Sequence, residues 1–230
     1  DRSSAASDVY KRQGLRCSGS PGNPQRGPHP SAACSCATPV IQPCHNVHMH
    51  IYFSSVYGST KQYAEELARR LSTTVQEILN HAEVPDTAAE GPIIVLAPAH
   101  GPMNAAAKFV KSLPETTIQA SPTCVVTVGM TLDHVVREAD PTAELLGDRA
   151  DQVQRFYLPG RLNYSELTAA HAGVMRGIIG ALKLKPRKSE NERSMIEMYK
   201  KDTDRVDLSR LDEIVAWAEA AKGAKQLKKI

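Results

Sequence analysis

The chain has 230 residues, of which 41% are hydrophobic, and a formal net charge of +3 at pH 7. No stretch approaches the roughly 20 consecutive apolar residues that a membrane-spanning helix needs, because Arg176, Lys183 and Lys185 interrupt the most apolar segment. This composition argues against a transmembrane protein, so any membrane contact is expected to be peripheral.

Residues 1–48 differ in composition from the rest of the chain. They hold six prolines with many Ser and Gly, and they show no helical or strand periodicity. They also lack the apolar region of a signal peptide. The hexapeptide at residues 8–13 resembles the translation of a sequencing-transposon end. We therefore expect residues 1–48 to be a disordered, non-native leader, with Met49 as the true start and one domain over residues 49–230.

Four of the five cysteines and a group of histidines, residues that could bind a metal, lie in this leader or just after it. They are Cys17, Cys34, Cys36, Cys44, His45, His48 and His50. Their spacing matches no standard zinc finger, and the segment offers no scaffold to fix ligand geometry, so we expect no metal site. The domain keeps only Cys124, which lies in an apolar run where a lone cysteine is more often a small buried hydrophobe than a nucleophile. This use of cysteine favours a reducing, cytoplasmic compartment.

After Met49, apolar strand patterns alternate with helical patterns. The expected strands are residues 51–54, 75–78, 92–97, 123–128 and 154–158, and the expected helices are 61–71, 105–113, 133–146 with a break at Pro141, 164–184 and 208–221. The third run, after Gly91, is apolar throughout, which is typical of a central parallel strand covered on both faces. This alternation predicts an α/β fold, a doubly wound sheet of five parallel strands with helices on both faces.

A hydroxyl-rich turn connects the first strand to the first helix. Its sequence is Ser54-Ser55-Val56-Tyr57-Gly58-Ser59-Thr60. A helix that starts after such a turn directs backbone N–H groups and the positive end of its dipole at one point, which predicts a phosphate site. With one glycine and no lysine, the turn fits neither the G-x-x-x-x-G-K-[ST] nor the G-x-G-x-x-G nucleotide motif. The alternative is a plain Ser/Thr helix cap, but a cap needs only one hydroxyl.

The run from Ile51 to Leu67 resembles the flavodoxin signature, in which the first strand leads into [ST]-x-x-G-x-T and then a helix. The signature positions are occupied by Ser55, Gly58, Thr60, Ala64 and Leu67. The resemblance implies a flavodoxin-like fold with FMN as cofactor. It also implies that the whole turn, residues 54–60, holds the FMN phosphate.

The resemblance further places the isoalloxazine ring of FMN between the loops after the third and fourth strands. Each loop contains a glycine, which lets the backbone approach a planar ligand. Neither loop contains the tyrosine or tryptophan that many flavodoxins stack on the ring. The expected ring contacts are Ala99, His100, Gly101, Met103 and Asn104 in the first loop and Gly129, Met130 and Thr131 in the second.

The C-terminal half resembles a narrower group. The segment from Leu158 to Tyr164, the long helix after it and the final helix around Trp217 are similar to the flavodoxin-domain group that includes the bacterial quinone-linked protoporphyrinogen dehydrogenase. This resemblance implies an FMN-dependent oxidoreductase of haem biosynthesis that oxidises protoporphyrinogen IX, a tetrapyrrole, and passes electrons to a quinone. Substrate propionates, or anionic lipid at a membrane surface, would then pair with Arg161, Lys183, Lys185, Arg187 and Lys188. A solvated basic loop is the simpler interpretation of these cations.

Two other interpretations stay open. The domain could be an FMN-binding electron-transfer flavodoxin or redox-sensing module without substrate chemistry of its own, or a flavodoxin fold that has lost its flavin. The net charge of +3 argues against the acidic docking face of electron carriers, and the intact turn argues against a lost flavin. The expected partner is a redox partner or a quinone, with no nucleic acid.

Overall fold

The structure is a computed structural model that describes residues 49–78, 91–99 and 103–227. The chain divides into two units, Asp1–Cys44 and His45–Ile230. All of the described residues belong to the second unit. The predicted leader, residues 1–48, lies outside the described residues, so its interpretation stays a prediction.

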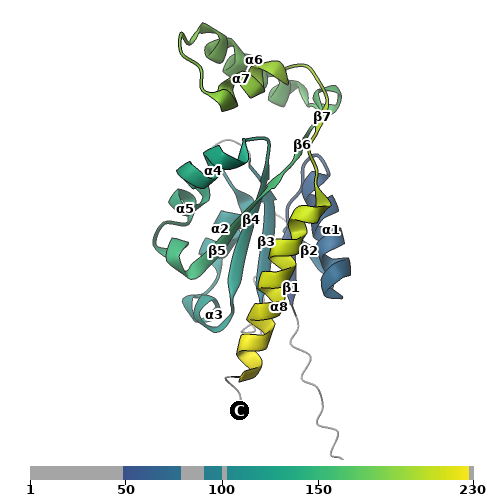
Figure 1. Cartoon of the computed structure of the whole chain (residues 1–230), viewed down its shortest axis with the longest axis vertical. Helices are drawn as coiled ribbons and strands as arrows, with labels where there is room; N and C mark the ends of the chain where they lie inside the picture. Colours follow the sequence, from purple (N-terminus) through teal and green to yellow (C-terminus); the bar gives the residue numbers. More distant parts are fainter. Residues whose placement is uncertain (1–48, 79–90, 100–102, 228–230) are drawn as a thin grey trace, which may run out of the picture. The chain divides into compact units, whose positions relative to one another are not determined.

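Five parallel strands form one sheet in the order β2-β1-β3-β4-β5 (Figure 1). The strands are β1 His50–Phe53, β2 Val75–Glu77, β3 Ile93–Pro98, β4 Thr123–Gly129 and β5 Val153–Pro159. Residues 93–97 of β3 are buried, as its continuous apolar run predicts, and every residue of β4 is buried as well. The strand order reverses between β1 and β3. Open α/β sheets bind ligands beyond the carboxyl ends of the strands at such a point.

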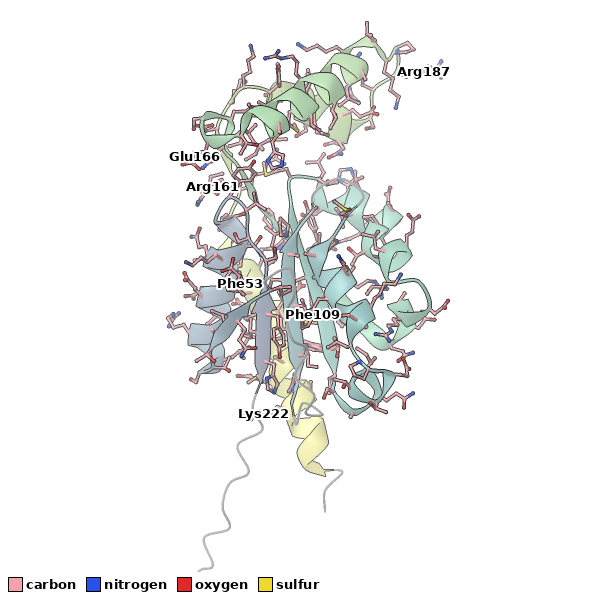
Figure 2. The ribbon with its side chains drawn as sticks, turned by 180° about the vertical axis from the view of Figure 1, so that it is seen from behind. Phe53, Phe109, Arg161, Glu166, Arg187 and Lys222 are labelled. Atoms are coloured by element: carbon pink, nitrogen blue, oxygen red, sulfur yellow. The ribbon has the colours of Figure 1, made fainter. Side chains whose placement is uncertain are left out.

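Helices cover both faces of the sheet, which confirms the predicted fold class. Helices α1 Ser59–Leu71 and α8 Leu211–Leu227 belong to one core cluster, and α2 Ala105–Ser112, α3 Glu115–Ala120 and α5 Pro141–Leu146 belong to the other. Phe53 lies in the first cluster and Phe109 in the second (Figure 2). The buried Cys124 lies in the first cluster, and burial raises the pKa of its thiol, which confirms a structural cysteine.

The predicted break at Pro141 is confirmed. It separates α4 Asp133–Ala139 from α5. Asp140 lies at the junction with φ 35°, and its carboxylate accepts a hydrogen bond of 3.1 Å from the backbone N–H of Ala143. The 3-10 helix η1 Gly147–Gln152 then leads into β5.

Residues 160–207 form a lobe between β5 and α8. It contains β6 Arg161–Leu162, η2 Tyr164–Glu166, α6 Ala169–Leu184, α7 Glu190–Glu197 and β7 Thr203–Asp204. Strands β6 and β7 pair in antiparallel fashion and form a second, two-stranded sheet. The 3-10 helix η3 Leu208–Arg210 precedes α8. Among the described residues, no helix combines the length and the apolar character needed to cross a membrane.

The prediction of one continuous helix over residues 164–184 was wrong. The chain forms η2, becomes extended at Leu167, and starts α6 only at Ala169. The cause is Thr168, whose hydroxyl accepts a hydrogen bond of 3.3 Å from the backbone N–H of His171 and caps a new helix. Helix α7 was not predicted. It begins with a capping box between Ser189 and Glu192 inside a polar stretch without apolar periodicity.

Glu66 binds two arginines of its own helix, and one of them, Arg70, joins α1 to α8. Its carboxylate lies 2.7 Å from both Arg69 and Arg70, and Arg70 also contacts Asp212 at 2.7 Å. Arg70 further donates a 3.0 Å hydrogen bond to the carbonyl of Leu208. The hydrogen bonds from Arg69 and Arg70 lower the pKa of Glu66 from 4.5 to about 2.

Replacing Glu66 with glutamine is therefore expected to change how stability depends on pH. A carboxylate with a lowered pKa stabilises the fold above its unfolded pKa and loses this contribution as the pH falls through the folded pKa. Wild type should be more stable than E66Q, and this difference in unfolding free energy should have its maximum value above pH 4.5. It should disappear as the pH falls to about 2. Urea unfolding at a series of pH values measures it. Glu65→Gln is the control, because the Glu65–Lys61 pair is exposed and 3.8 Å apart. An E66Q difference that does not vary with pH would contradict this role.

Candidate functional site

The turn after β1 opens α1 with a left-handed glycine. Gly58 has φ 84° and ψ −23°, and apart from its chain neighbours no described residue lies within 4 Å of the position that a Cβ would take. The backbone angle, and not the available space, therefore favours glycine. The hydroxyl of Ser55 accepts hydrogen bonds from the N–H groups of Gly58 at 3.2 Å and Lys61 at 3.3 Å. Ser55 thus fixes the shape of the turn.

The remaining donors of the turn fit a phosphate group. Ser59 and Thr60 are buried in the first turn of α1, and their hydroxyls form no hydrogen bond within the part of the chain that the structure describes. The backbone N–H groups of a first helical turn have no acceptor in their own helix. Residues 54–60 contain no carboxylate. Neutral hydroxyls, free N–H groups and the positive end of the α1 dipole therefore converge on one place.

Tyr57 connects this turn to the lobe. Its hydroxyl is hydrogen-bonded to Nδ1 of His171 in α6, and the two rings meet edge to face with centroids 5.9 Å apart. Next to it, the side chain of Val56 is 52% exposed although it is apolar. An exposed valine in this position offers apolar surface to a bound ligand.

The first predicted ring loop is described only in part, because His100 and Gly101 lie outside the described residues. Ala99 is exposed, and the side chain of Met103 is 74% exposed. Asn104 has a structural role, because its side-chain oxygen accepts hydrogen bonds from the N–H groups of Ala106 and Ala107, and its amide nitrogen donates to Thr127 at 3.0 Å. Asn104 thereby caps α2. Its contact with a flavin stays a prediction.

The second ring loop packs closely against Tyr157 of β5. A Cβ on Gly129 would lie 3.0 Å from the hydroxyl of Tyr157 and 3.3 Å from Cβ of Ala99. The Tyr157 hydroxyl donates a 2.9 Å hydrogen bond to the carbonyl of Thr131, and burial raises the pKa of Tyr157. Packing against Tyr157 and Ala99 therefore explains why position 129 is a glycine, without a bound ligand. Met130 and Thr131 are partly exposed and remain predicted ring contacts.

Helix α7 contacts the same loop. The backbone N–H of Leu132 donates to the side chain of Asn191 at 3.1 Å, and Nε2 of His134 lies 3.6 Å from Glu190. Together with the contact between Tyr57 and His171, these pairs tie the lobe to both the phosphate turn and the second ring loop. Sequence reasoning missed His171, Asn191 and Glu190, since nothing in the chain pattern links them to loops so far away.

Two tyrosines, Tyr63 in α1 and Tyr164 in the lobe, have structural positions. Tyr63 is fully buried; its hydroxyl donates to the carbonyl of Pro159 and accepts from the N–H of Asp207, each at 2.7 Å. Burial raises the pKa of this phenol, so it keeps the proton that it donates. Tyr164 packs edge to face on Tyr199 in the lobe, with centroids 5.6 Å apart.

Most of the basic side chains expected to bind propionates already have protein partners. Arg161 pairs with Asp204 at 2.7 Å, and Lys185 pairs with Glu192 at 2.6 Å. The Lys183 ammonium lies 5.5 Å from the ring centre of Tyr199, and Lys188 donates to the carbonyl of Lys185. These contacts favour structural roles for several of these cations.

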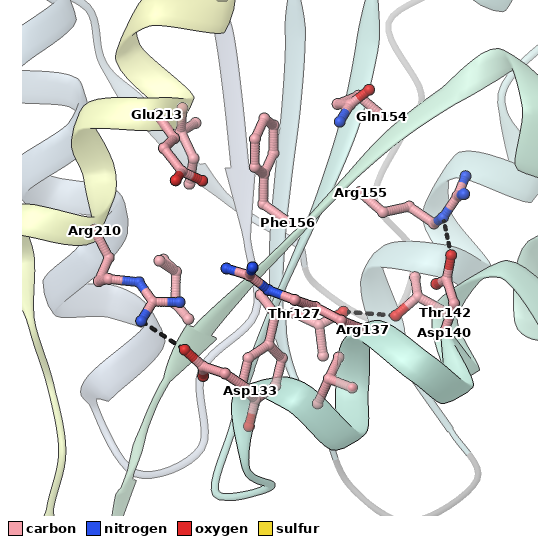
Figure 3. Close-up of a pocket in the computed structure, with 14 residues that line it drawn as sticks. Thr127, Asp133, Arg137, Asp140, Thr142, Gln154, Arg155, Phe156, Arg210 and Glu213 are labelled. Carbon is pink, nitrogen blue, oxygen red and sulfur yellow. Dashed lines mark hydrogen bonds and ion pairs between the residues drawn. The ribbon is translucent and has the colours of Figure 1, made fainter.

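A cavity of about 430 Å³ lies beside the edge strand β5 (Figure 3). Its walls carry ion pairs, Asp133 with Arg210 at 2.6 Å and Asp140 with Arg155 at 2.9 Å. None of the described residues predicted to bind FMN lines this cavity. It is therefore separate from the candidate cofactor site.

Comparison with known proteins agrees with the geometry of the turn. A family model for a flavodoxin domain matches residues 50–190, which span the five-stranded sheet, the phosphate turn, both ring loops and α6. No curated protein matches the chain. The family match indicates a flavin-binding redox function. The strand order, the left-handed glycine in a hydroxyl turn and the match over more than half of the residues lead to one conclusion: the chain belongs to the flavodoxin domain family.

Proposed function

We propose that the protein is an FMN-dependent oxidoreductase. The observation that carries this proposal is the turn at residues 54–60, where Gly58 holds a left-handed conformation and the buried Ser59 and Thr60 keep hydroxyls without a partner among the described residues. Such a donor set suits a terminal phosphate, which FMN carries. The exposed apolar side chains of Val56 and Met103 supply surface for a flat ring.

When bound, the flavin would supply two-electron chemistry, while the protein supplies placement and electrostatics. Ser59, Thr60 and the first N–H groups of α1 would hold the phosphate. The contact between Tyr157 and the Thr131 carbonyl would keep the second ring loop in position. The contacts of His171 and Asn191 with the site loops would limit access of water from the side of the lobe.

We further propose protoporphyrinogen IX as the substrate and a quinone as the electron acceptor, which would place the protein in haem biosynthesis. The support is the resemblance of residues 158–164, the long helix α6 and the final helix to the group that includes the quinone-linked dehydrogenase. A lobe that contacts both the phosphate turn and a ring loop also provides protein surface at the site for a substrate larger than the flavin itself.

The alternative is an electron-transfer flavodoxin or a redox-sensing module. The described residues of the two ring loops, residues 99, 103, 104 and 129–132, carry no titratable side chain. The first such side chain after the second loop is Asp133 at the start of α4, and it is paired with Arg210 at 2.6 Å. Described loops without an acid or base suit a protein that only passes electrons.

An anaerobic assay separates these two functions. The full chain, loaded with FMN, is mixed with protoporphyrinogen IX and a quinone, and porphyrin formation is followed by its fluorescence. We expect porphyrin formation that depends on both the protein and the quinone, with free FMN at the same concentration as the control. A protein that holds FMN and accepts electrons from a chemical reductant but forms no porphyrin would favour the alternative.

A further inference from the structure

One face of helix α6 is not covered by any other described residue. Of its 16 residues, only Ile179 is buried. The exposed positions include a set of apolar residues spaced at three and four, as on a single helix face. They are Ala170, Gly173, Val174, Gly177, Ile178, Ala181 and Leu184. We call this set the α6 apolar face. Among the described residues, the exposed large hydrophobic side chains are five, and three of them lie on this face: Val174, Ile178 and Leu184.

The opposite side of α6 forms the interior of the lobe. Ile179 is 2% exposed, and Ala172, Met175 and Leu182 are partly buried on the same side. The Lys183 ammonium also points toward this interior, because it lies over the ring of Tyr199. The α6 apolar face therefore is not needed for the packing of α6 against the described part of the lobe.

A strong positive charge accompanies this face. Residues 167–189 contain five Lys or Arg residues and no Asp or Glu, and one of the five, Lys185, pairs with Glu192 of α7. Three of them, Lys185, Arg187 and Lys188, form what we call the basic turn, which follows the last apolar residue, Leu184. Figure 2 shows Arg187 at the end of the lobe remote from Arg161. Apolar surface thus continues directly into cationic surface.

We propose that the α6 apolar face and the basic turn bind the surface of an anionic lipid bilayer. An amphipathic helix lies in the membrane interface when it offers apolar side chains to the acyl region and cations to the headgroups. Each Lys or Arg near an anionic leaflet adds to the attraction, which acts within about a Debye length, roughly 8–10 Å. The contact is peripheral, since no described helix can cross the membrane. This inference goes beyond the proposed function and does not depend on flavin.

A second copy of the chain is a poorer occupant of the same face. A stable protein interface buries about 800 Å² on each partner, whereas this face holds three large apolar side chains among glycines and alanines. Pairing two copies through α6 would also bring together two segments with five cations each and no acidic residue. Lys185 is neutralised by Glu192, but the like charges of the other cations oppose such pairing, whereas an anionic leaflet supplies counter-charges to them.

Flotation of the full chain with lipid vesicles tests the proposal. We expect binding to vesicles of phosphatidylglycerol and phosphatidylcholine, weak binding to pure phosphatidylcholine vesicles, and a decrease of binding at high salt. The double variant Val174→Gln, Ile178→Gln removes apolar surface without changing charge, and should bind anionic vesicles about tenfold less tightly or worse. The double variant Arg187→Gln, Lys188→Gln should reduce binding to anionic vesicles about tenfold as well.

The control is the double variant Lys108→Gln, Lys111→Gln, which removes the same charge from exposed positions on α2. It should bind as wild type does. Absence of binding to anionic vesicles, or equal losses in the α2 control and the basic-turn variant, would overturn the proposal. A wild-type dimer in light scattering that becomes monomeric in the Val174→Gln, Ile178→Gln variant would also overturn it and assign the face to a second copy. FMN binding should stay unchanged in all of these variants, so this test is independent of the cofactor.

Discussion

Replacing Thr60 with valine is expected to weaken FMN binding by about tenfold to a hundredfold. Valine keeps the shape of threonine but removes the hydroxyl, and a phosphate oxygen left without its donor costs about 1–3 kcal/mol. Thr60 is 1% exposed and makes no hydrogen bond with another described residue, so its hydroxyl is available to a ligand and is not required by the protein. The fold should therefore tolerate the change.

Quenching of flavin fluorescence during titration measures this affinity, and circular dichroism checks the fold. Thr117→Val is the matched control, because Thr117 is also a buried threonine, at 6% exposure, but lies in α3, outside the predicted FMN-binding loops. Its FMN affinity should equal that of wild type. An unchanged affinity in the Thr60 variant would remove Thr60 from the phosphate site.

Replacing Tyr63 with phenylalanine is expected to lower the free energy of unfolding by about 1–3 kcal/mol, because a carbonyl and an N–H lose their partner. The Tyr63 hydroxyl donates to the carbonyl of Pro159, just before the lobe, and accepts from the N–H of Asp207, the last residue of the lobe, both at 2.7 Å. This one side chain thus holds the two ends of the lobe together against α1. Loosening the lobe should also weaken its contacts with the phosphate turn, so FMN affinity should fall together with stability.

Urea unfolding of the apoprotein measures the stability effect. The control is Tyr52→Phe, since Tyr52 is likewise buried, at 6% exposure, and packs on Phe109, but its hydroxyl has no hydrogen bond to a described residue. This control should change stability little. Equal effects of the two variants would show that the pair of hydrogen bonds at Tyr63 adds no stability.

The strands were predictable because each is a short apolar run bounded by turn residues. The run at Ile93–Ala97 is the clearest, and its complete burial between two helical layers follows from its lack of polar positions. The break at Pro141 was equally local, because proline removes a helical donor. Such features depend on neighbouring residues, which a sequence displays directly.

The lobe was less predictable. The start of α6 depends on one hydroxyl, that of Thr168, and α7 depends on the capping box of Ser189 and Glu192, so apolar periodicity alone did not locate either helix end. The pairing of β6 with β7 joins residues about forty positions apart through only two residues on each strand. Two residues on each strand are too few to give a recognisable strand pattern in the sequence, so this pairing could not be predicted.

In the candidate site too, features that depend on neighbouring residues were predictable, and features that depend on distant residues were not. The turn at residues 54–60 carries a local signature, and its left-handed glycine and its buried Ser59 and Thr60 agree with it. The ring loops carry none, and the structure gives Asn104 and Gly129 packing roles that the sequence could not reveal. The contact of His171 with Tyr57 arises only from the folded chain, 114 positions apart.

The most direct measurement is a comparison of FMN with riboflavin, which has the same ring but no phosphate. The full chain, freed of flavin, is titrated with each compound while flavin fluorescence is followed. We predict saturable FMN binding that is at least about tenfold tighter than riboflavin binding, because each hydrogen bond to a charged group contributes roughly 1.5–3 kcal/mol. No saturable binding of FMN, or equal affinities for the two compounds, would contradict a phosphate site in the turn at residues 54–60.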